Sequence, residues 1–322
     1  MVRKNFSILK ILQRNLMFFS MLSFVFISTF TLSLSLKSIE VVEIEGEVKG
    51  ERTIYPKRPV LRENFSSFPI LSGQAVLAMD IDSGVTLYEK NPDQALLPAS
   101  TTKIFTSMVA MDGYDLEQTL KITGISVDGQ KMGLIEGEEI SVGDLLYGLL
   151  VFSANDAAEV LAQNYCADQV CGRDKFVEMM NKKAQDLGLR NTKFENPSGL
   201  DGQNQRSTAR DLVLASIHAM KNQFFKTVVG TKEHTVQSID GKHIHKLRNI
   251  NELLGVEDGV LGIKTGWTHN ARENLVTYTE KDGRKIMIAI LGSQGRFGET
   301  KELLDWIYEN YTWEDVVYSY RP

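Results

Sequence analysis

The sequence has few of the residues that metal and redox sites require. Only two cysteines and five histidines occur among its 322 residues. His243 and His245 fall on one face of an expected strand, but no cysteine or carboxylate cluster joins them and no H-E-x-x-H motif is present. We therefore expect neither a metal site nor a cofactor. The net charge of -5 lacks the basic surplus that neutralises phosphates, so no nucleic-acid partner is expected.

One long stretch near the N-terminus, residues 16–36, has no charged residue at all. As a helix it is long enough to cross a hydrocarbon core of about 30 Å. The flank before it is basic, with Arg3, Lys4, Lys10 and Arg14. Because basic flanks stay in the cytoplasm, we predict a cytoplasmic tail at residues 1–14 and a membrane-spanning signal-anchor at 15–37, with all later residues outside. The alternative is a cleaved signal peptide and a secreted protein, although no A-x-A site is present.

The rest of the chain is long enough for one large domain. Residues 38–70 mix acidic, basic and proline residues without sustained periodicity, which predicts a linker. We expect the domain at residues 71–312 and a short tail at 313–322. Two cysteines, Cys166 and Cys171, stand close together in that domain. Outside the cytoplasm such a pair forms either a small-loop disulfide or two free thiols, and the sequence leaves both open.

Strand-like segments lie at both ends of this domain, with helical segments between them. Residues 75–80 and 85–88 predict a hairpin, residues 285–291 predict another strand, and residues 303–308 lie in a final helix. Thr208 to Asp211 reads as a capping box that opens a helix. This order favours the α/β class, with an antiparallel sheet flanked by helices.

Three short motifs stand out in this background, and together they hold the groups that serine acyl transfer needs. In chain order they are Ser100-Thr101-Thr102-Lys103, Ser153-Ala154-Asn155 and Lys264-Thr265-Gly266. They supply a nucleophile, a base one helical turn away, a second hydroxyl with an amide, and a cation beside a glycine. No Ser-His-Asp arrangement competes for the role.

The first motif gains its meaning from its surroundings. Pro98 and an apolar run at residues 104–111 predict that Ser100 lies at the positive end of a helix, with Lys103 on the same face. The alternative is an ordinary helix N-cap. A second S-x-x-K, Ser7 to Lys10, lies before the long apolar stretch, where no active site is expected.

The other two motifs have ordinary readings as well. Ser153-Ala154-Asn155 separates two apolar helical stretches, so it is either a polar turn or a pair of substrate ligands. Lys264-Thr265-Gly266 lies on an expected strand at residues 262–268, where Lys264 and Gly266 share one face. Gly266 marks either a close approach of a bound peptide or a bulge, and Lys264 alone would read as a solvated lysine.

The sequence around the motifs resembles that of the D-alanyl-D-alanine carboxypeptidases, the low-molecular-mass penicillin-binding proteins of serine type. The resemblance runs from about Ser72 to about Tyr311. The segments that carry it, besides the motifs, are Leu96 to Ala99, Gly143 to Leu150, Asp156 to Ala158, Asn196 to Asp201, Ser207 to Leu212 and Asp258 to Gly262. It implies the transpeptidase fold shared by penicillin-binding proteins and β-lactamases, with a helical subdomain beside the sheet.

Roles follow for the motif residues. We expect Ser100 to be the nucleophile and Lys103 its base, kept neutral by burial and by the like charge of Lys264. Ser153 would relay a proton to the leaving amine, and Asn155 would bind the substrate backbone.

The remaining expected ligands come from the third motif and its neighbours. Lys264 and Thr265 suit a substrate carboxylate. By resemblance, the backbone N–H groups of Ser100 and Trp267 form the oxyanion hole. The Trp267 ring either walls the pocket beside Gly266 or packs in the core. Arg296 either reaches the carboxylate pocket, as an arginine does in relatives, or is a solvated loop residue.

The resemblance implies removal of the terminal D-alanine from peptidoglycan pentapeptide stems through an acyl-enzyme on Ser100, which β-lactam antibiotics would trap. The alternatives are an endopeptidase of peptidoglycan cross-links, a class A-like β-lactamase and an inactive penicillin-binding scaffold. No convincing segment carries the deacylating glutamate of the β-lactamases, although Glu195 precedes a turn. One departure from the family is Arg272 and Glu273, which are bulky and charged where small residues and glycine are expected.

Overall fold

The computed structural model describes residues 56–167 and 169–316. The predicted cytoplasmic tail, the membrane segment and the first part of the linker lie outside the described residues. Within the described ranges, no helix is both long enough and apolar enough to cross a membrane.

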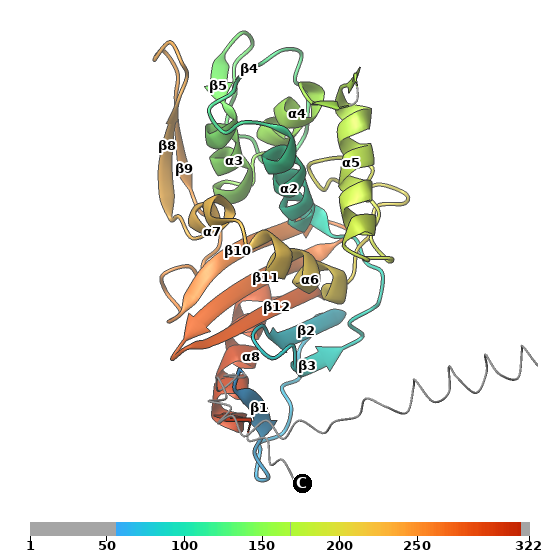
Figure 1. The fold of residues 1–322 in the computed structure, drawn as a ribbon, viewed down its shortest axis with the longest axis vertical. Helices are drawn as coiled ribbons and strands as arrows, with labels where there is room; N and C mark the ends of the chain where they lie inside the picture. Colours follow the sequence, from blue (N-terminus) through green and yellow to red (C-terminus); the bar gives the residue numbers. More distant parts are fainter. Residues whose placement is uncertain (1–55, 168, 317–322) are drawn as a thin grey trace, which may run out of the picture. The chain divides into compact units, whose positions relative to one another are not determined.

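A five-stranded antiparallel sheet forms the centre of the domain, in the order β10-β11-β12-β2-β3 (Figure 1). Its strands are β2 (Ala75–Asp80), β3 (Thr86–Lys90), β10 (Val260–Thr268), β11 (Arg272–Lys281) and β12 (Arg284–Ser293). The first two strands therefore come from the start of the domain and the other three from its end. The α/β prediction with an antiparallel sheet is confirmed, as are the hairpin β2–β3 and the strand at residues 285–291.

Both faces of the sheet are covered, so the middle residues of its central strands are buried. Helix α6 (Ala209–Ala219) packs on β2 and β12 from one side, and helix α8 (Arg296–Asn310) packs on β11 and β12 from the other. Side chains alternate along a strand, so Leu77 joins the core under α6 while its neighbour Val76 joins the core under α8.

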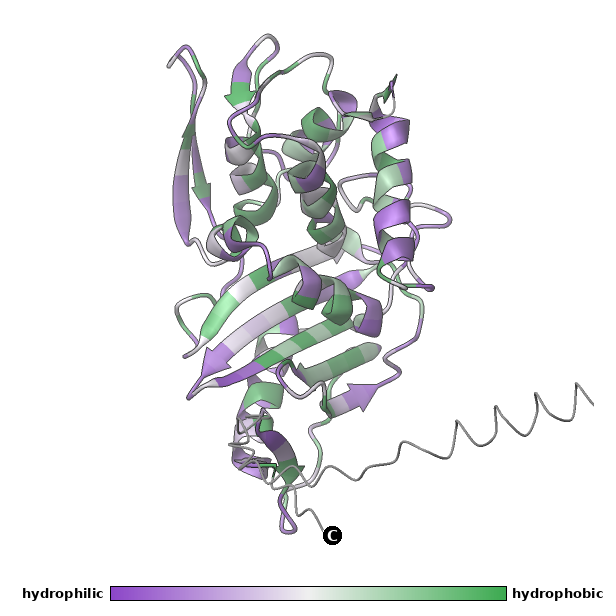
Figure 2. Cartoon of the chain, viewed as in Figure 1, coloured by the Kyte–Doolittle hydropathy of each residue, from purple (hydrophilic) through white to green (hydrophobic). Residues whose placement is uncertain are grey.

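The helical subdomain lies together on one side of the sheet in Figure 1. Its elements are η1 (Ala99–Thr102), α2 (Lys103–Gly113), α3 (Val142–Val151), α4 (Asn155–Gln163), α5 (Arg173–Asp186) and α7 (Gln223–Val229). Figure 2 shows hydrophobic residues along α2 and α3 and a largely hydrophilic α5. Helix α5 buries Phe176, Met180 and Ala184, which are four residues apart and so form one narrow apolar stripe.

Four two-stranded ribbons complete the described chain. They are β1 (Arg58–Leu61) with β13 (Tyr311–Glu314), β4 (Thr119–Lys121) with β5 (Glu139–Ser141), β6 (Cys166–Ala167) with β7 (Val170–Cys171), and β8 (Glu233–Gln237) with β9 (Ile244–Arg248). Because β1 pairs with β13, the folded unit begins before residue 71 and continues past residue 312, where the sequence predicted a linker and a tail.

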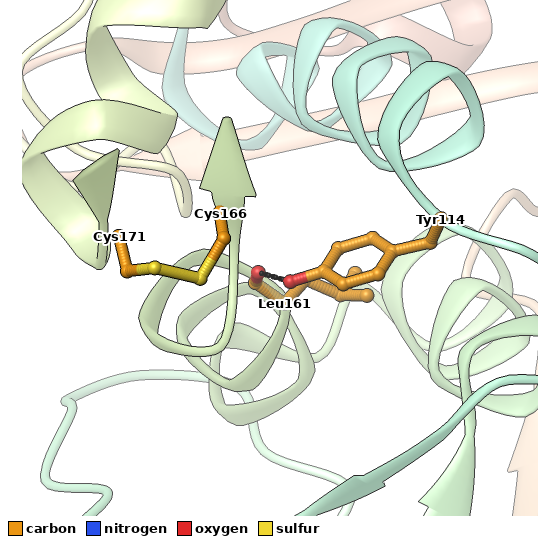
Figure 3. Close-up of a disulfide and its surroundings, with 4 residues drawn as sticks. All are labelled: Tyr114, Leu161, Cys166 and Cys171. Carbon is orange, nitrogen blue, oxygen red and sulfur yellow. Dashed lines mark hydrogen bonds between the residues drawn. A yellow bond between two sulfur atoms is a disulfide. The ribbon is translucent and has the colours of Figure 1, made fainter. Parts of the chain in front are cut away.

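The two cysteines form a disulfide that closes the β6–β7 ribbon directly after α4 (Figure 3). Of the two alternatives that the sequence left open, the structure therefore has the bridge. Beside it, the Tyr114 hydroxyl donates a 2.7 Å hydrogen bond to the Leu161 carbonyl and ties the end of α2 to α4. Thr208 caps α6 through the Asp211 N–H at 3.0 Å, as predicted.

Candidate active site

Ser100 and Lys103 lie on consecutive turns of one helical segment. Ser100 is in the 3-10 turn η1, which continues into α2 at Lys103. The Lys103 Nζ atom is 2.8 Å from Ser100 Oγ, 2.7 Å from Asn155 Oδ1 and 2.6 Å from the Ser198 carbonyl oxygen. These contacts place the lysine between the expected nucleophile and the second motif.

Burial controls the charge of Lys103, whose side chain is entirely enclosed. Loss of water lowers the pKa of Lys103 to about 7, against the opposing effect of the negative charges on Asp156 and Glu159. The sequence also assigned part of this shift to Lys264. In the structure the like charge acts on Lys264 instead, because burial and then the charges of Lys103 and Arg296 hold the pKa of Lys264 well below its ordinary value.

Ser153 lies beside Lys264 in the structure. Lys264 Nζ donates to Ser153 Oγ at 2.8 Å and to the Thr265 carbonyl at 3.0 Å. Ser153 adopts a left-handed backbone with φ of 62°, at the junction between α3 and α4. The sequence predicted that Ser153 relays a proton between lysine and the leaving amine, and in the structure its hydroxyl accepts a hydrogen bond from the lysine of the third motif.

Asn155 is fixed from both ends of its amide. Its Oδ1 accepts from Lys103, and its Nδ2 donates to the Asp128 carbonyl at 2.6 Å. Its backbone N–H donates to the Gln130 carbonyl at 2.7 Å. The substrate therefore meets an Asn155 amide that the protein has already oriented. One of its two Nδ2 hydrogens is donated to the Asp128 carbonyl.

The third motif lies on β10, the edge strand of the sheet, where it faces η1. A Cβ at Gly266 would come within 3.1 Å of the Ser100 nitrogen and of the Pro98 oxygen, so glycine lets the strand approach the nucleophile. The irregularity in β10 lies between Val260 and Gly262, which excludes a bulge at Gly266.

A second glycine packs against the same turn from the opposite loop. Gly199 has φ of 88°, and a Cβ there would lie 2.0 Å from the Ala99 oxygen and 3.0 Å from the Ser100 nitrogen. The Asn196–Asp201 segment was recognisable in the sequence as a family turn, but its contact with Ser100 and the role of the Ser198 carbonyl were not. Both depend on a backbone path that spacing does not reveal.

These groups surround a cavity of about 530 Å³. Its lining residues are Ser100, Gly129, Gln130, Ser153, Asn155, Gly199, Leu200, Ile250, Thr265, Gly266, Trp267, Thr268, His269 and Arg296.

 

Six of the eight predicted site residues line the cavity, and two do not. The six are Ser100, Ser153, Asn155, Thr265, Gly266 and Trp267. Lys103 and Lys264 are both absent from the lining, and each contacts a lining serine from behind. The three motifs therefore meet around one cavity, with both lysines enclosed in its wall.

Trp267 and Arg296 each had two readings in the sequence, and the structure separates them. The Trp267 side chain is 62% exposed and lines the cavity, which excludes core packing. Arg296 opens α8 and donates from Nη1 to the Gly266 carbonyl at 2.7 Å. Burial lowers the pKa of Arg296, so it is not a solvated loop residue.

Residues 63–295 match the model of the S11 peptidase family, described as D-alanyl-D-alanine carboxypeptidase. The chain belongs to the D-alanyl-D-alanine carboxypeptidase family. The family recognised from the motifs is therefore confirmed.

Several curated members of the family are similar to the chain. It is 30% identical over 248 residues to the D-alanyl-D-alanine carboxypeptidase DacF of Bacillus subtilis, covering 74% of this chain and 62% of DacF. It is 34% identical over 252 residues to DacB2 of Mycobacterium tuberculosis, covering 74% and 84%. A D-alanyl-D-alanine endopeptidase of Pseudomonas aeruginosa is 32% identical over 246 residues, covering 74% and 77%.

Solved structures of the family share the fold. The Streptomyces K15 DD-transpeptidase matches with a TM-score of 0.69 and 30% identity, covering 76% of this chain and all of that one. A penicillin-binding protein homologue of Mycobacterium tuberculosis matches with a TM-score of 0.71 and 31% identity, covering 80% and 100%. The predicted penicillin-binding-protein fold is confirmed.

The departure from the family pattern has a local structural account. Arg272 is exposed and adopts φ of 60°, a backbone that glycine reaches without strain. Glu273 Oε2 accepts the Arg296 N–H at 2.9 Å, so its carboxylate lies at the start of α8. Both charged side chains are accommodated without displacing β10 from η1.

No group of three or more potential metal ligands occurs among the described residues. His245 is buried, with Nε2 2.7 Å from Glu138 Oε1 and Nδ1 3.1 Å from the Met132 carbonyl. A single carboxylate and a carbonyl satisfy both ring nitrogens, so this histidine has a structural environment.

Proposed function

We propose that the protein is a serine-type D-alanyl-D-alanine carboxypeptidase that removes the terminal D-alanine from peptidoglycan stem peptides. The observation that carries this proposal is the set of contacts around Lys103. Asn155 Oδ1 and the Ser198 carbonyl can only accept hydrogen bonds, so they take both N–H groups of a neutral amine. The lone pair of that amine is then directed at the Ser100 hydroxyl, 2.8 Å away.

Acylation follows from this arrangement. Lys103 takes the Ser100 proton while Oγ attacks the carbonyl carbon of the penultimate D-alanine. The oxyanion forms beside the Ser100 N–H, which two glycines leave accessible, and beside the Trp267 N–H. When the C–N bond breaks, the proton that Lys103 took from Ser100 passes through the Ser153 hydroxyl to the departing amine. The acyl-enzyme remains on Ser100.

The substrate carboxylate is assigned to the end of the cavity lined by Thr265 and Arg296, with the enclosed Lys264 in the wall behind Ser153. Arg296 Nε is buried and has no hydrogen-bond partner in the described part of the chain, which supports an anionic ligand. A carboxylate would also offset the repulsion between the two buried cations.

Deacylation needs a water molecule activated by a base. Lys103, neutral again once its proton has passed to the leaving amine, is placed to activate water at the Ser100 ester. No residue lining the cavity has a carboxylate, and the Glu195 carboxylate lies outside the lining, where it accepts a hydrogen bond from Asn204 at 2.8 Å, so the glutamate of a class A-like β-lactamase has no counterpart among the described residues. β-Lactams are therefore expected to acylate Ser100 and to form an acyl-enzyme that is hydrolysed slowly.

An endopeptidase activity on peptidoglycan cross-links is a second candidate, favoured by a hollow of about 420 Å³ next to the cavity. Ile250 lines both spaces, and the hollow continues with the cations Lys232 and Arg248. Burial lowers the pKa of Arg296 overall, and the charge of Glu252, which also lines the hollow, acts in the opposite direction, so the hollow is electrostatically coupled to the carboxylate end. We assign this space to the larger leaving group of a cross-linked peptide.

The two candidates differ in their response to one substitution. Arg248→Ala should slow cleavage of a cross-linked peptide dimer and leave release of D-alanine from a linear pentapeptide unchanged. An equal effect of the substitution on both substrates, or no cleavage of the dimer by the unaltered protein, would contradict the endopeptidase.

We also propose that the catalytic domain works outside the cytoplasm, held at the cell membrane by the N-terminal segment. Only the sequence supports this, through the uncharged stretch at residues 16–36 and its basic flank. Peptidoglycan lies on that side of the membrane. Cell fractionation of the full chain, followed by carbonate extraction, tests it, and recovery of the intact chain in the cytosol would contradict it.

The decisive experiment is labelling of the full chain in detergent with a fluorescent penicillin, followed by assay of D-alanine release from a D-Ala-D-Ala pentapeptide. We expect a stable label and D-alanine release, both lost in Ser100→Ala. Ser7→Ala is the matched control, because Ser7 also precedes a lysine by three residues. Rapid turnover of the drug without D-alanine release would favour a β-lactamase, and no label would favour the inactive scaffold.

A further inference from the structure

Asp156, the residue after Asn155, has a buried carboxylate whose hydrogen bonds in the described part of the chain come from backbone N–H groups and from no cation. Its side chain accepts four backbone N–H groups, from Met132 at 3.1 Å, Gly133 at 2.9 Å, Leu134 at 3.1 Å and Ala157 at 3.0 Å. The residue is only 3% exposed. Buried carboxylates are costly unless hydrogen bonds satisfy them, so this one fixes the loop that supplies the donors.

That loop forms one wall of the cavity. Its carbonyls at Asp128 and Gln130 accept the two hydrogen bonds of Asn155, from Nδ2 and from the backbone N–H. Gly129 and Gln130 line the cavity. A Cβ at Gly129 would lie 2.7 Å from Asn155 Nδ2, so the loop and the amide are in close contact. Asn155 and Asp156, which are adjacent on α4, therefore both form hydrogen bonds with this loop, at two separate places.

We propose that Asp156 is a positioning residue, which holds the loop at residues 128–134 as a cavity wall and, through Asn155, holds Lys103 against Ser100. This inference rests on the proposed function. The chain of contacts runs from the Asp156 carboxylate to the loop, from the loop carbonyls to Asn155, and from Asn155 Oδ1 to Lys103 Nζ at 2.7 Å.

The charge of Asp156 has a second effect on the same lysine. It raises the pKa of Lys103 against the larger effect of burial, and Glu159 acts in the same direction. The other charged or titratable groups around these elements include Asp128 and Lys131, which are exposed on the loop itself. They also include Arg173, which pairs with Glu159 at 2.7 Å, Lys264 on β10, and His245 with Glu138 beside Met132. Removing the negative charge of Asp156 should therefore lower the pKa of Lys103.

The test compares Asp156→Asn with Glu159→Gln in the full chain, using the second-order rate constant for acylation by a penicillin across the pH range. An asparagine amide places an NH₂ group against backbone donors, so Asp156→Asn loses acceptors as well as charge. We expect its plateau rate to fall by about 10- to 100-fold and its acid limb to move to lower pH. Glu159→Gln should move the limb in the same direction with a smaller fall in plateau, since Glu159 does not hold the loop.

A wild-type plateau and limb in Asp156→Asn would overturn the inference. So would a reduced amount of active protein whose remaining sites keep the wild-type limb, because a purely structural role predicts that result. If Asp156→Asn does not fold, Asp156→Glu keeps the charge and displaces the loop, and we expect a lower plateau with an unmoved limb. If the unaltered protein is not acylated at all, the proposed function fails and not this inference alone.

Discussion

Lys264 Nζ lies 2.8 Å from Ser153 Oγ, so the second and third motifs are joined by a direct hydrogen bond. The hydroxyl that is assigned to the leaving amine is thus held by the lysine that is assigned to the substrate carboxylate. Binding of the carboxylate and delivery of the proton are coupled through one ammonium group.

This coupling predicts the effect of Lys264→Met, which keeps a long side chain without a charge. We expect kcat/KM for D-alanine release to fall by about 10²- to 10³-fold, the usual effect of removing one preorganised donor. KM should rise because the carboxylate loses its cation, and kcat should fall because Ser153 loses its partner. Steady-state kinetics on a pentapeptide checks this, and a change in KM alone would contradict the coupling.

The lowered pKa of Lys103 predicts the pH dependence of acylation. With a pKa of about 7, Lys103 is neutral and competent above that pH and is increasingly protonated below it. The acylation rate should therefore fall toward acid with a limb near pH 7. Lys103→Arg should be inactive at every pH, because a guanidinium does not release its proton. A limb near pH 10 would mean that the lysine is not desolvated.

The left-handed backbone of Arg272 predicts a stabilising substitution. A non-glycine residue there costs roughly 1–2 kcal/mol, and the greater chain entropy of glycine offsets about 0.5–1 kcal/mol of that. Arg272→Gly should thus raise the free energy of unfolding by about 0.5–1 kcal/mol, measured by thermal or urea denaturation. Arg248→Gly, on a strand with ordinary φ, is the matched control and should be destabilising.

The disulfide is expected to contribute to stability and not to catalysis. It closes a short loop between positions five apart, for which chain entropy predicts about 2 kcal/mol. Replacing Cys166 and Cys171 with serine should lower the melting temperature and leave penicillin acylation unchanged, because Tyr114 still ties α4 to α2. A loss of acylation at a temperature where the variant is folded would contradict this.

The sequence was sufficient to predict residues that the structure brings together around one cavity, because three motifs in one order leave few alternatives. It also predicted the sheet hairpin and the cap of α6, which depend on local patterns. It did not predict the partner of Ser153 or the contacts of the Ser198 carbonyl. Those contacts depend on how loops distant in sequence pack around α4, and the spacing of residues along the sequence does not reveal that packing.

The order of strands in the sheet also determines when the site is completed during synthesis. Strand β2 pairs with β12, whose residues are made about two hundred positions later, and β10 reaches the sheet only through β11 and β12. A nascent chain that has made Ser100 and Lys103 still lacks the strand with Lys264 and the edge that closes on η1. Unfinished chains therefore lack part of the cavity wall, and the three motifs come together only as the last strands of the sheet are added.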